Sequence, residues 1–161
     1  MTGGTDTGGD GGTVLIVGAD PRDVRAVSCG LAREDISLDI AANVRTAIDR
    51  LTLASESAAP LPDLVALDLT TEPSKGLTVL DAIKSSPRLH ALPTIALVDP
   101  TAPADGEQNL VRDAYRCGVN GHLPRPDDAE AYADEIRRLA AFWFGRVVLP
   151  PESLYTDSPS V

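Results

Sequence analysis

The sequence predicts an α/β fold in which a parallel sheet is covered by helices on both sides. Short apolar runs rich in β-branched residues alternate along the chain with segments of helical period, five of each. This alternation is typical of parallel strands joined by crossover helices. The central run, from Asp63 to Leu67, is apolar enough for a strand that is buried on both faces.

The individual elements are placed by hydrophobic period and by turn residues. Strands are expected at residues 13–17, 36–41, 63–67 and 93–98 and within residues 118–124. Helices are expected over residues 20–34, after Asn43, over 76–86, after Gly106 and from Asp127 onward. Polar or proline-containing connections are expected at 55–61, 70–75 and 99–106.

Local signals support several of the helix starts and helix faces. Asp20 is placed as an N-cap, with Pro21 at the first helical position, and Asn43 can cap the next helix. Asp127, with Glu130 three positions later, resembles a capping box. The positions expected to face inward on the third and fourth helices are Leu77, Leu80 and Ile83, and Leu110, Val111, Ala114 and Tyr115.

The composition is that of one globular domain with tails. The chain has 161 residues, and no apolar run approaches the roughly 18 residues of a membrane span. Residues 1–12 are rich in Gly, Thr and Asp and lack a basic, apolar signal region, so we expect a disordered tail and a cytoplasmic protein. The two cysteines, Cys29 and Cys117, lack metal-ligand spacing and are expected to be small core residues.

The charge balance is strongly acidic. Twenty-four acidic residues stand against fourteen basic ones, a formal net charge of -10. Nucleic-acid binding needs clustered Lys and Arg, so this balance argues against a nucleic-acid partner. Asp outnumbers Glu and only two residues are lysine, a halophilic-type bias that suits a high-salt cytoplasm or a GC-rich genome.

Asp68 ends the central apolar run and is the main candidate for chemistry. A polar stretch follows it, and then Gly76. In open parallel sheets, ligands and reactive groups gather at the carboxyl ends of the strands. The alternative, of equal weight on these residues alone, is that Asp68 caps a helix or a turn.

The spacing around Asp68 resembles that of a known family. The run PDLVALDL from Pro62, with Gly76 eight residues after Asp68 and an amphipathic helix next, resembles the phosphoacceptor segment of CheY-like response-regulator receiver domains. The resemblance covers roughly residues 13–138. It implies a flavodoxin-like sheet of strand order 2-1-3-4-5, with a tail at 1–12, a receiver-like domain at 13–141 and an extension at 142–161.

The resemblance also implies a chemistry. Receivers accept a phosphoryl group from a sensor histidine kinase on one aspartate, and Mg²⁺, a Lys and a Ser or Thr hydroxyl hold that group. Asp68 matches the phosphoacceptor, whereas the acidic pair that helps to bind Mg²⁺ falls on Gly18 and Ala19. Asp20 stands one place later, so Asp20 and Asp68 are the remaining metal ligands, and we expect Mg²⁺ to bind weakly.

The phosphate-contact positions of receivers also differ in this chain. The hydroxyl position falls on Val98, the Lys of the family's Lys-Pro pair falls on Arg125, and the switch aromatic falls on His122. Arg125 either pairs with Asp68, and so mimics or locks one signalling state, or is a surface charge. His122 either titrates near neutral pH or is a partly buried side chain on a strand edge.

The carboxyl-terminal segment carries aromatic residues beyond a minimal receiver. FWFGRVVLPP, from Phe142 on, resembles the ending of stand-alone response regulators that are partners of cyanobacterial phytochromes. Phe142, Trp143, Phe144 and Val147 therefore predict a homodimer interface. The alternative is that they pack on the protein's own core.

The predicted function is a single-domain, atypical receiver-like protein of two-component signal transduction, a phosphorelay, with weak or absent Mg²⁺-dependent phosphorylation. The alternative is a phosphorylation-independent interaction or dimerisation module. An enzyme is not expected, because haloacid-dehalogenase phosphatases need a second Asp where Thr70 stands. The segment after the first strand matches neither a dinucleotide fingerprint nor a P-loop.

Overall fold

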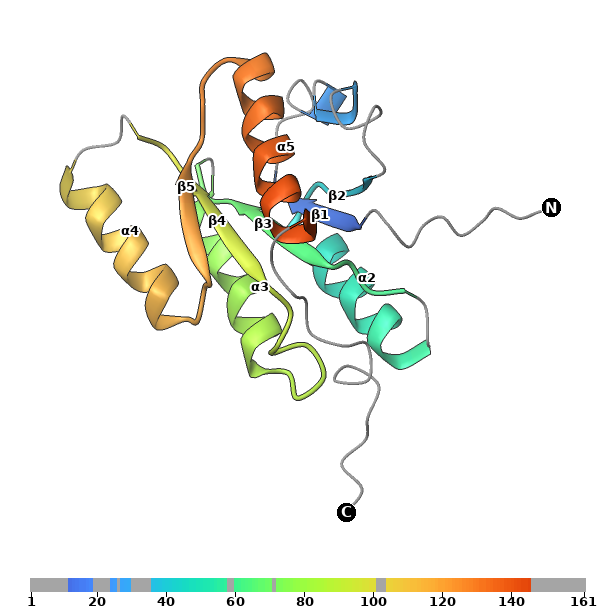
Figure 1. Cartoon of the computed structure of the whole chain (residues 1–161). Coiled ribbons are helices and arrows are strands. Elements are labelled where there is room, and N and C mark those ends of the chain that lie inside the picture. Colours follow the sequence, from blue (N-terminus) through green and yellow to red (C-terminus); the bar gives the residue numbers. More distant parts are fainter. Residues whose placement is uncertain are drawn as a thin grey trace.

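The computed structural model describes residues 12–18, 24–25, 27–29, 36–57, 60–70, 72–100 and 104–145. The strands are β1 (Thr13–Val17), β2 (Ser37–Ala41), β3 (Leu64–Asp68), β4 (Thr94–Val98) and β5 (Gly121–Pro124). The labelled helices are α2 (Val44–Ser57), α3 (Pro73–Ser85), α4 (Ala104–Arg116) and α5 (Ala129–Gly145). The strands form one parallel sheet in the order β2-β1-β3-β4-β5 (Figure 1), which confirms the predicted fold class and strand order.

Two hydrophobic layers cover the sheet, one on each face. On one face, alternate strand residues such as Leu15 and Val65 pack with buried residues of α2, α3 and α4. On the other face, Val14 and Leu64 pack with Val27 and with α5. The alternation of strand side chains therefore decides which helices each residue contacts.

Two helices begin earlier than the sequence indicated. The predicted loop at 70–75 is wrong in its second half, because α3 begins at Pro73, a residue suited to the first turn of a helix. Gly76 is therefore helical and buried, and an added Cβ would lie 2.1 Å from Leu69 Cδ2. The predicted loop at 99–106 also ends early, because α4 begins at Ala104.

Other local predictions are refined or corrected. Asn43 caps α2 as expected, since its Oδ1 accepts a hydrogen bond from Thr46 N at 2.9 Å, but α2 continues to Ser57 into the predicted linker. The cap of α5 is Asp128 and not Asp127, because Asp128 Oδ2 accepts from Ala131 N at 3.0 Å. The predicted capping box is therefore wrong.

Two predicted core positions are wrong, because Tyr115 is 47% exposed on α4 and Cys29 is exposed. Leu77 and Cys117 are partly buried and pack against the core, and Val79 is a further buried residue of α3.

Several predictions fall on residues that are not described. Residues 24–25 and 27–29 are helical, but the Asp20 cap and the rest of the expected helix over 20–34 lie outside the described residues. So do residues 1–11 and 146–161, which include Val147. The expected boundary at residue 141 falls within α5, which continues to Gly145. Among the described residues, no helix is both long and apolar enough to span a membrane.

Candidate functional site around Asp68

Asp68 is the last residue of β3, at the carboxyl edge of the sheet. It lies two and four residues after Ala66 and Leu64, so its side chain belongs to the face of the sheet that α5 covers. Its side chain is only 1% exposed. A buried carboxylate is stable only when cations and hydrogen-bond donors surround it.

Three side chains supply those donors. Arg125 Nε donates to Asp68 Oδ2 at 2.9 Å, and the phenol of Tyr132 donates to the same oxygen at 3.3 Å. Thr70 donates to Oδ1 twice, through its backbone N at 3.0 Å and through its hydroxyl. Both carboxylate oxygens are therefore engaged from within the protein.

Arg125 reaches Asp68 because the backbone directly after β5 places it there. Its backbone N donates to Val98 O at 2.7 Å, which ties the segment to the end of β4. The side chain is 16% exposed and lies over the Tyr132 ring, with Cζ 4.9 Å from the ring centroid. The expected proximity of Asp68 and Arg125 is confirmed. Arg125 is not a free surface charge.

Tyr132 comes from the first turns of α5 and is 1% exposed. Tyr132 stands at helical spacing from Ile136 and Leu139, which indicates that it is buried, and its hydroxyl gives no separate signal in the sequence. Burial raises the pKa of the Tyr132 phenol well above its ordinary value, and the negative charge of Asp68 raises it further. The phenol therefore stays protonated and serves as a donor.

Thr70 was also missed as a contributor to the site. Its backbone N–H bonds the carboxylate two residues earlier, which is the geometry of an Asx turn. The pattern Asp-x-Thr after a strand is a usable signal for this arrangement. The alternative prediction, that Asp68 caps a turn, is therefore correct in part. Asp68 accepts a hydrogen bond from the turn that follows it and also pairs with Arg125.

Known structures have the same architecture. The chain superposes on the phosphorylated cyanobacterial phytochrome response regulator RcpA with a TM-score of 0.74 at 23% identity, over 88% of this chain and 99% of that one. On the Mn²⁺-bound response regulator Rcp1 the chain superposes with a TM-score of 0.71 at 26% identity, over 87% of this chain and 99% of that one. On a response regulator in red light signalling of R. palustris it superposes with a TM-score of 0.68 at 27% identity, over 87% of this chain and 99% of that one. The chain folds as a response-regulator receiver domain.

The sequence is also similar to that of one curated protein. The probable methanogenesis regulatory protein FilR2 of Methanothrix harundinacea is 33% identical over 101 residues, or 63% of this chain. The match spans 62% of FilR2, less than two thirds of its length. No family model matches the chain. The comparisons therefore show that the fold of the chain is that of response-regulator receiver domains.

The described residues offer few side-chain ligands for a divalent metal beside Asp68. No group of three or more His, Cys, Asp or Glu side chains suited to a metal occurs among the described residues. Gly18, which faces the Asp68 backbone, offers no side-chain ligand, and both Asp68 oxygens already accept hydrogen bonds from Arg125, Tyr132 and Thr70. Asp20, the other expected ligand, lies outside the described residues.

The remaining expected positions of the receiver site lie as follows. Val98 is buried at the end of β4 and contributes only its backbone oxygen, to Arg125. His122 is exposed on β5, where its Nδ1 lies 3.1 Å from the Tyr115 hydroxyl. The two rings meet edge to face, with centroids 5.7 Å apart. His122 is thus joined to α4.

The aromatic end of α5 is divided between core and surface. Trp143 and Phe144 are partly buried against the α5-side core, and the Phe144 ring lies against Gly12, before β1. Phe142 is 55% exposed and meets Trp143 edge to face at 6.0 Å. The self-packing alternative therefore holds for two of the three rings, and Phe142 is the ring that a partner could still cover.

Proposed function

We propose that this protein is a cytoplasmic two-component signalling protein that acts by protein contact and does not depend on Mg²⁺-dependent phosphorylation of Asp68. Its partner is a sensor histidine kinase or another signalling protein. The observation that carries the proposal is the Asp68–Arg125 pair, with the Asp68 side chain 1% exposed.

The physical reason lies in what phosphoryl transfer requires. A carboxylate oxygen must reach the donor phosphorus in line, and cations must neutralise the transferred group. Here the guanidinium of Arg125 is already used on Asp68 Oδ2, and Thr70 holds Oδ1. Freeing the carboxylate would leave a buried charge without its partners, which is costly.

Intact-mass measurement after treatment with a small phosphodonor and Mg²⁺ tests the proposal. We expect unmodified protein, while a receiver of known activity in the same reaction gains one phosphate. An Arg125→Lys variant, which restores the family's residue, is the informative comparison because it retains a cation but loses the planar guanidinium. A single phosphate adduct on the natural chain that disappears in Asp68→Asn would overturn the proposal.

The exposure of Phe142 favours a second function, homodimerisation through α5. Phe142 and Trp143 line one side of a surface cavity of about 340 Å³, which Leu123 of β5 and Leu139 of α5 also line. A second copy of this surface would cover Phe142. This surface is called the α5–β5 face below, and Val147, which follows it in the chain, is proposed to contribute.

A further inference from the structure

β2 lies at one edge of the sheet, and among the described residues it pairs only with β1 (Figure 1). An edge strand carries backbone N–H and C=O groups that point away from the sheet and can pair with a further strand. β5 forms the other edge, and it ends in Pro124, which has no backbone N–H to offer. β2 has the sequence SLDIA, without a proline. Protection of this edge must therefore come from other residues.

Ile40 is a residue of β2 whose backbone groups point away from β1. Ser37 N donates to Gly12 O at 2.8 Å, and Ala41 O accepts from Gly18 N at 3.0 Å, so the odd-numbered residues of β2 bond toward β1. In a parallel strand, both backbone groups of one residue point to the same side, and those of the next residue point to the other side. The N–H and C=O of Ile40 therefore point to the open side of the edge.

Asp39 and Arg50 bond both of these backbone groups. Ile40 N donates to Asp39 Oδ1 at 2.9 Å, and Arg50, from the second turn of α2, donates through Nη1 to Ile40 O at 2.6 Å. The same Nη1 forms an ion pair with Asp39 Oδ1, so the three residues form a closed ring of hydrogen bonds. Asp is uncommon in strands, and here its side chain and that of Arg50 replace the contacts of a neighbouring strand.

We propose that the Asp39–Arg50 pair closes the β2 edge against strand addition and so prevents this edge from pairing with the β2 edge of a second copy. In the natural chain, both outward groups of Ile40 already have partners, so an incoming strand would have to break the ring before it could bond there. The proposal depends neither on the chemistry of Asp68 nor on the α5–β5 face.

A second copy is the partner that an opened β2 edge fits. Two copies related by a twofold axis bring their β2 strands together in antiparallel orientation, and the N–H and C=O of each outward residue then bond to the other copy. The side chains of Leu38 and Ile40, which are half-buried in one chain, would gain cover from the same residues of that copy. The edge is therefore complementary to itself in hydrogen bonding and in apolar contact.

Hydrogen exchange of the full-length chain at low concentration tests whether the ring closes the edge. The double variant Asp39→Ala/Arg50→Ala removes one charge of each sign, and so does the matched control Arg45→Ala/Asp49→Ala, whose two residues are exposed on α2. The Ile40 amide should exchange about three- to tenfold faster in the double variant, the size expected for the loss of one hydrogen bond. It should keep its natural rate in the control.

The same variants at rising concentration test the pairing of two copies. In sedimentation, the double variant should form larger species than the natural chain does at the same concentration, whereas the control should sediment like the natural chain. In these larger species the Ile40 amide should become protected again. The amides at positions 37 and 39 should change little, because they already bond toward β1.

The single variant Arg50→Ala separates the two backbone groups of Ile40. Ala favours helices, so this variant is expected to keep the fold even if the double variant does not. It opens the Ile40 carbonyl and keeps the bond from Ile40 N to Asp39, so it should associate more than Arg45→Ala. Association of Arg50→Ala no stronger than that of Arg45→Ala, a natural exchange rate for Ile40 in the folded double variant, or larger species that leave this amide fast would each overturn the proposal.

Discussion

At the scale of single residues, the site is a carboxylate whose counter-ion is built into the chain. Arg125 forms an ion pair with Asp68 at the position where an external cation would have to bind. Tyr132 contacts both partners, because its hydroxyl donates a hydrogen bond to Asp68 and its ring packs against the Arg125 guanidinium. Asp68, Arg125 and Tyr132 lie on β3, after β5 and on α5, so the site connects three elements.

Removing the cation should destabilise the fold strongly. Arg125→Gln should lower the free energy of unfolding by about 2–4 kcal/mol, because Asp68 would remain buried with its charge uncompensated. Asp68→Asn in the same chain should recover much of the loss, since no charge then remains. Urea denaturation measures both, with exposed Arg112→Gln as the control. A change below about 0.5 kcal/mol in Arg125→Gln would contradict this assignment.

Tyr132 should make stability depend on alkaline pH. Its pKa is raised above 10 by burial and by Asp68, so its contribution is complete below pH 10 and is lost as the pH rises above 10. The stability advantage over Tyr132→Phe should shrink above pH 10 by up to about 1.4 kcal/mol per pH unit. Urea unfolding between pH 8 and 11 measures this difference, in which groups common to both proteins cancel. A constant difference would exclude Tyr132 as the titrating donor.

The proximity of Asp68 and Arg125 could be predicted because it depends on topology, although the sequence left open whether Arg125 pairs with Asp68 or is a surface charge. Parallel strands bring their carboxyl ends to one edge, and the spacing placed both residues just there. Thr70 and Tyr132 could not be found in the same way. Their roles depend on where one hydroxyl points, and the apolar period of α5 indicated only that Tyr132 is buried.

At the scale of elements, Lys84 connects several segments at the amino edge of the sheet by hydrogen bonds. Lys84 Nζ, at the end of α3, donates to Leu92 O at 3.0 Å, to Asn120 Oδ1 at 3.2 Å and to His90 O at 3.3 Å. These acceptors lie in the connections that enter β4 and β5. Burial lowers the pKa of Lys84, and the three acceptors compensate for part of that cost.

Replacing this lysine should loosen both connections. Lys84→Met should cost about 1–3 kcal/mol, because acceptors of the two connections lose a charged donor. Lys75→Met is a matched control, since Lys75 is the other lysine, is exposed and pairs only on the surface with Glu72 at 2.9 Å. Its cost should be below about 1 kcal/mol. Thermal unfolding measures the loss of stability in both variants. Equal losses would show that Lys84 stabilises the fold no more than the exposed Lys75 does.

The boundaries of helices were less predictable than their existence. The predicted loop at 70–75 includes Pro73, although proline at the first helical turn favours a helix start. The polar residues Ser74 and Lys75 give the first turn of α3 the appearance of a loop. At α5, the sequence predicts Asp127 as the cap, but the adjacent Asp128 accepts the hydrogen bond. Which residue caps a helix depends on the position and direction of the backbone where the preceding strand ends.

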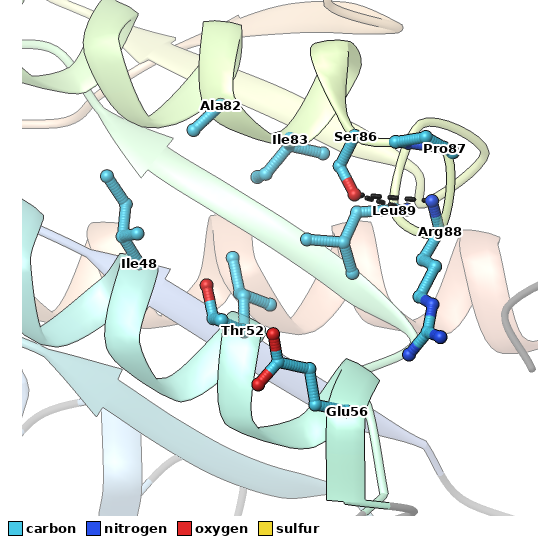
Figure 2. Close-up of a pocket in the computed structure, with 10 residues that line it drawn as sticks. Ile48, Thr52, Glu56, Ala82, Ile83, Ser86, Pro87, Arg88 and Leu89 are labelled. Atoms are coloured by element: carbon cyan, nitrogen blue, oxygen red, sulfur yellow. Dashed lines mark hydrogen bonds between the residues drawn. The ribbon is translucent and has the colours of Figure 1, made fainter.

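At the scale of the whole molecule, the two faces of the sheet present different surfaces. The α5–β5 face carries the exposed Phe142, and a cavity of about 600 Å³ lies between α2 and α3 on the opposite face (Figure 2). A dimer that formed through the α5–β5 face would therefore leave this cavity uncovered.

The dimer prediction is best tested at Phe142. Phe142→Ala should weaken self-association by about 1–2 kcal/mol without loss of stability, because the ring is exposed in one chain. Trp143→Ala should weaken it by roughly 2 kcal/mol or more, but it should also destabilise the monomer, since Trp143 packs on the core. Sedimentation at several concentrations measures both, with exposed Leu53→Ala on α2 as the control. A natural chain that is monomeric throughout would leave only the self-packing alternative.

Gly18 limits which substitutions the turn after β1 accepts. Its φ is +86°, a conformation that side chains other than glycine rarely adopt, and an added Cβ would lie 3.2 Å from the Asp68 backbone oxygen. A single mutation that placed a carboxylate at this position would meet backbone strain before it could bind any ion. An engineered metal site beside Asp68 would therefore need a new backbone path for this turn as well as the new side chain.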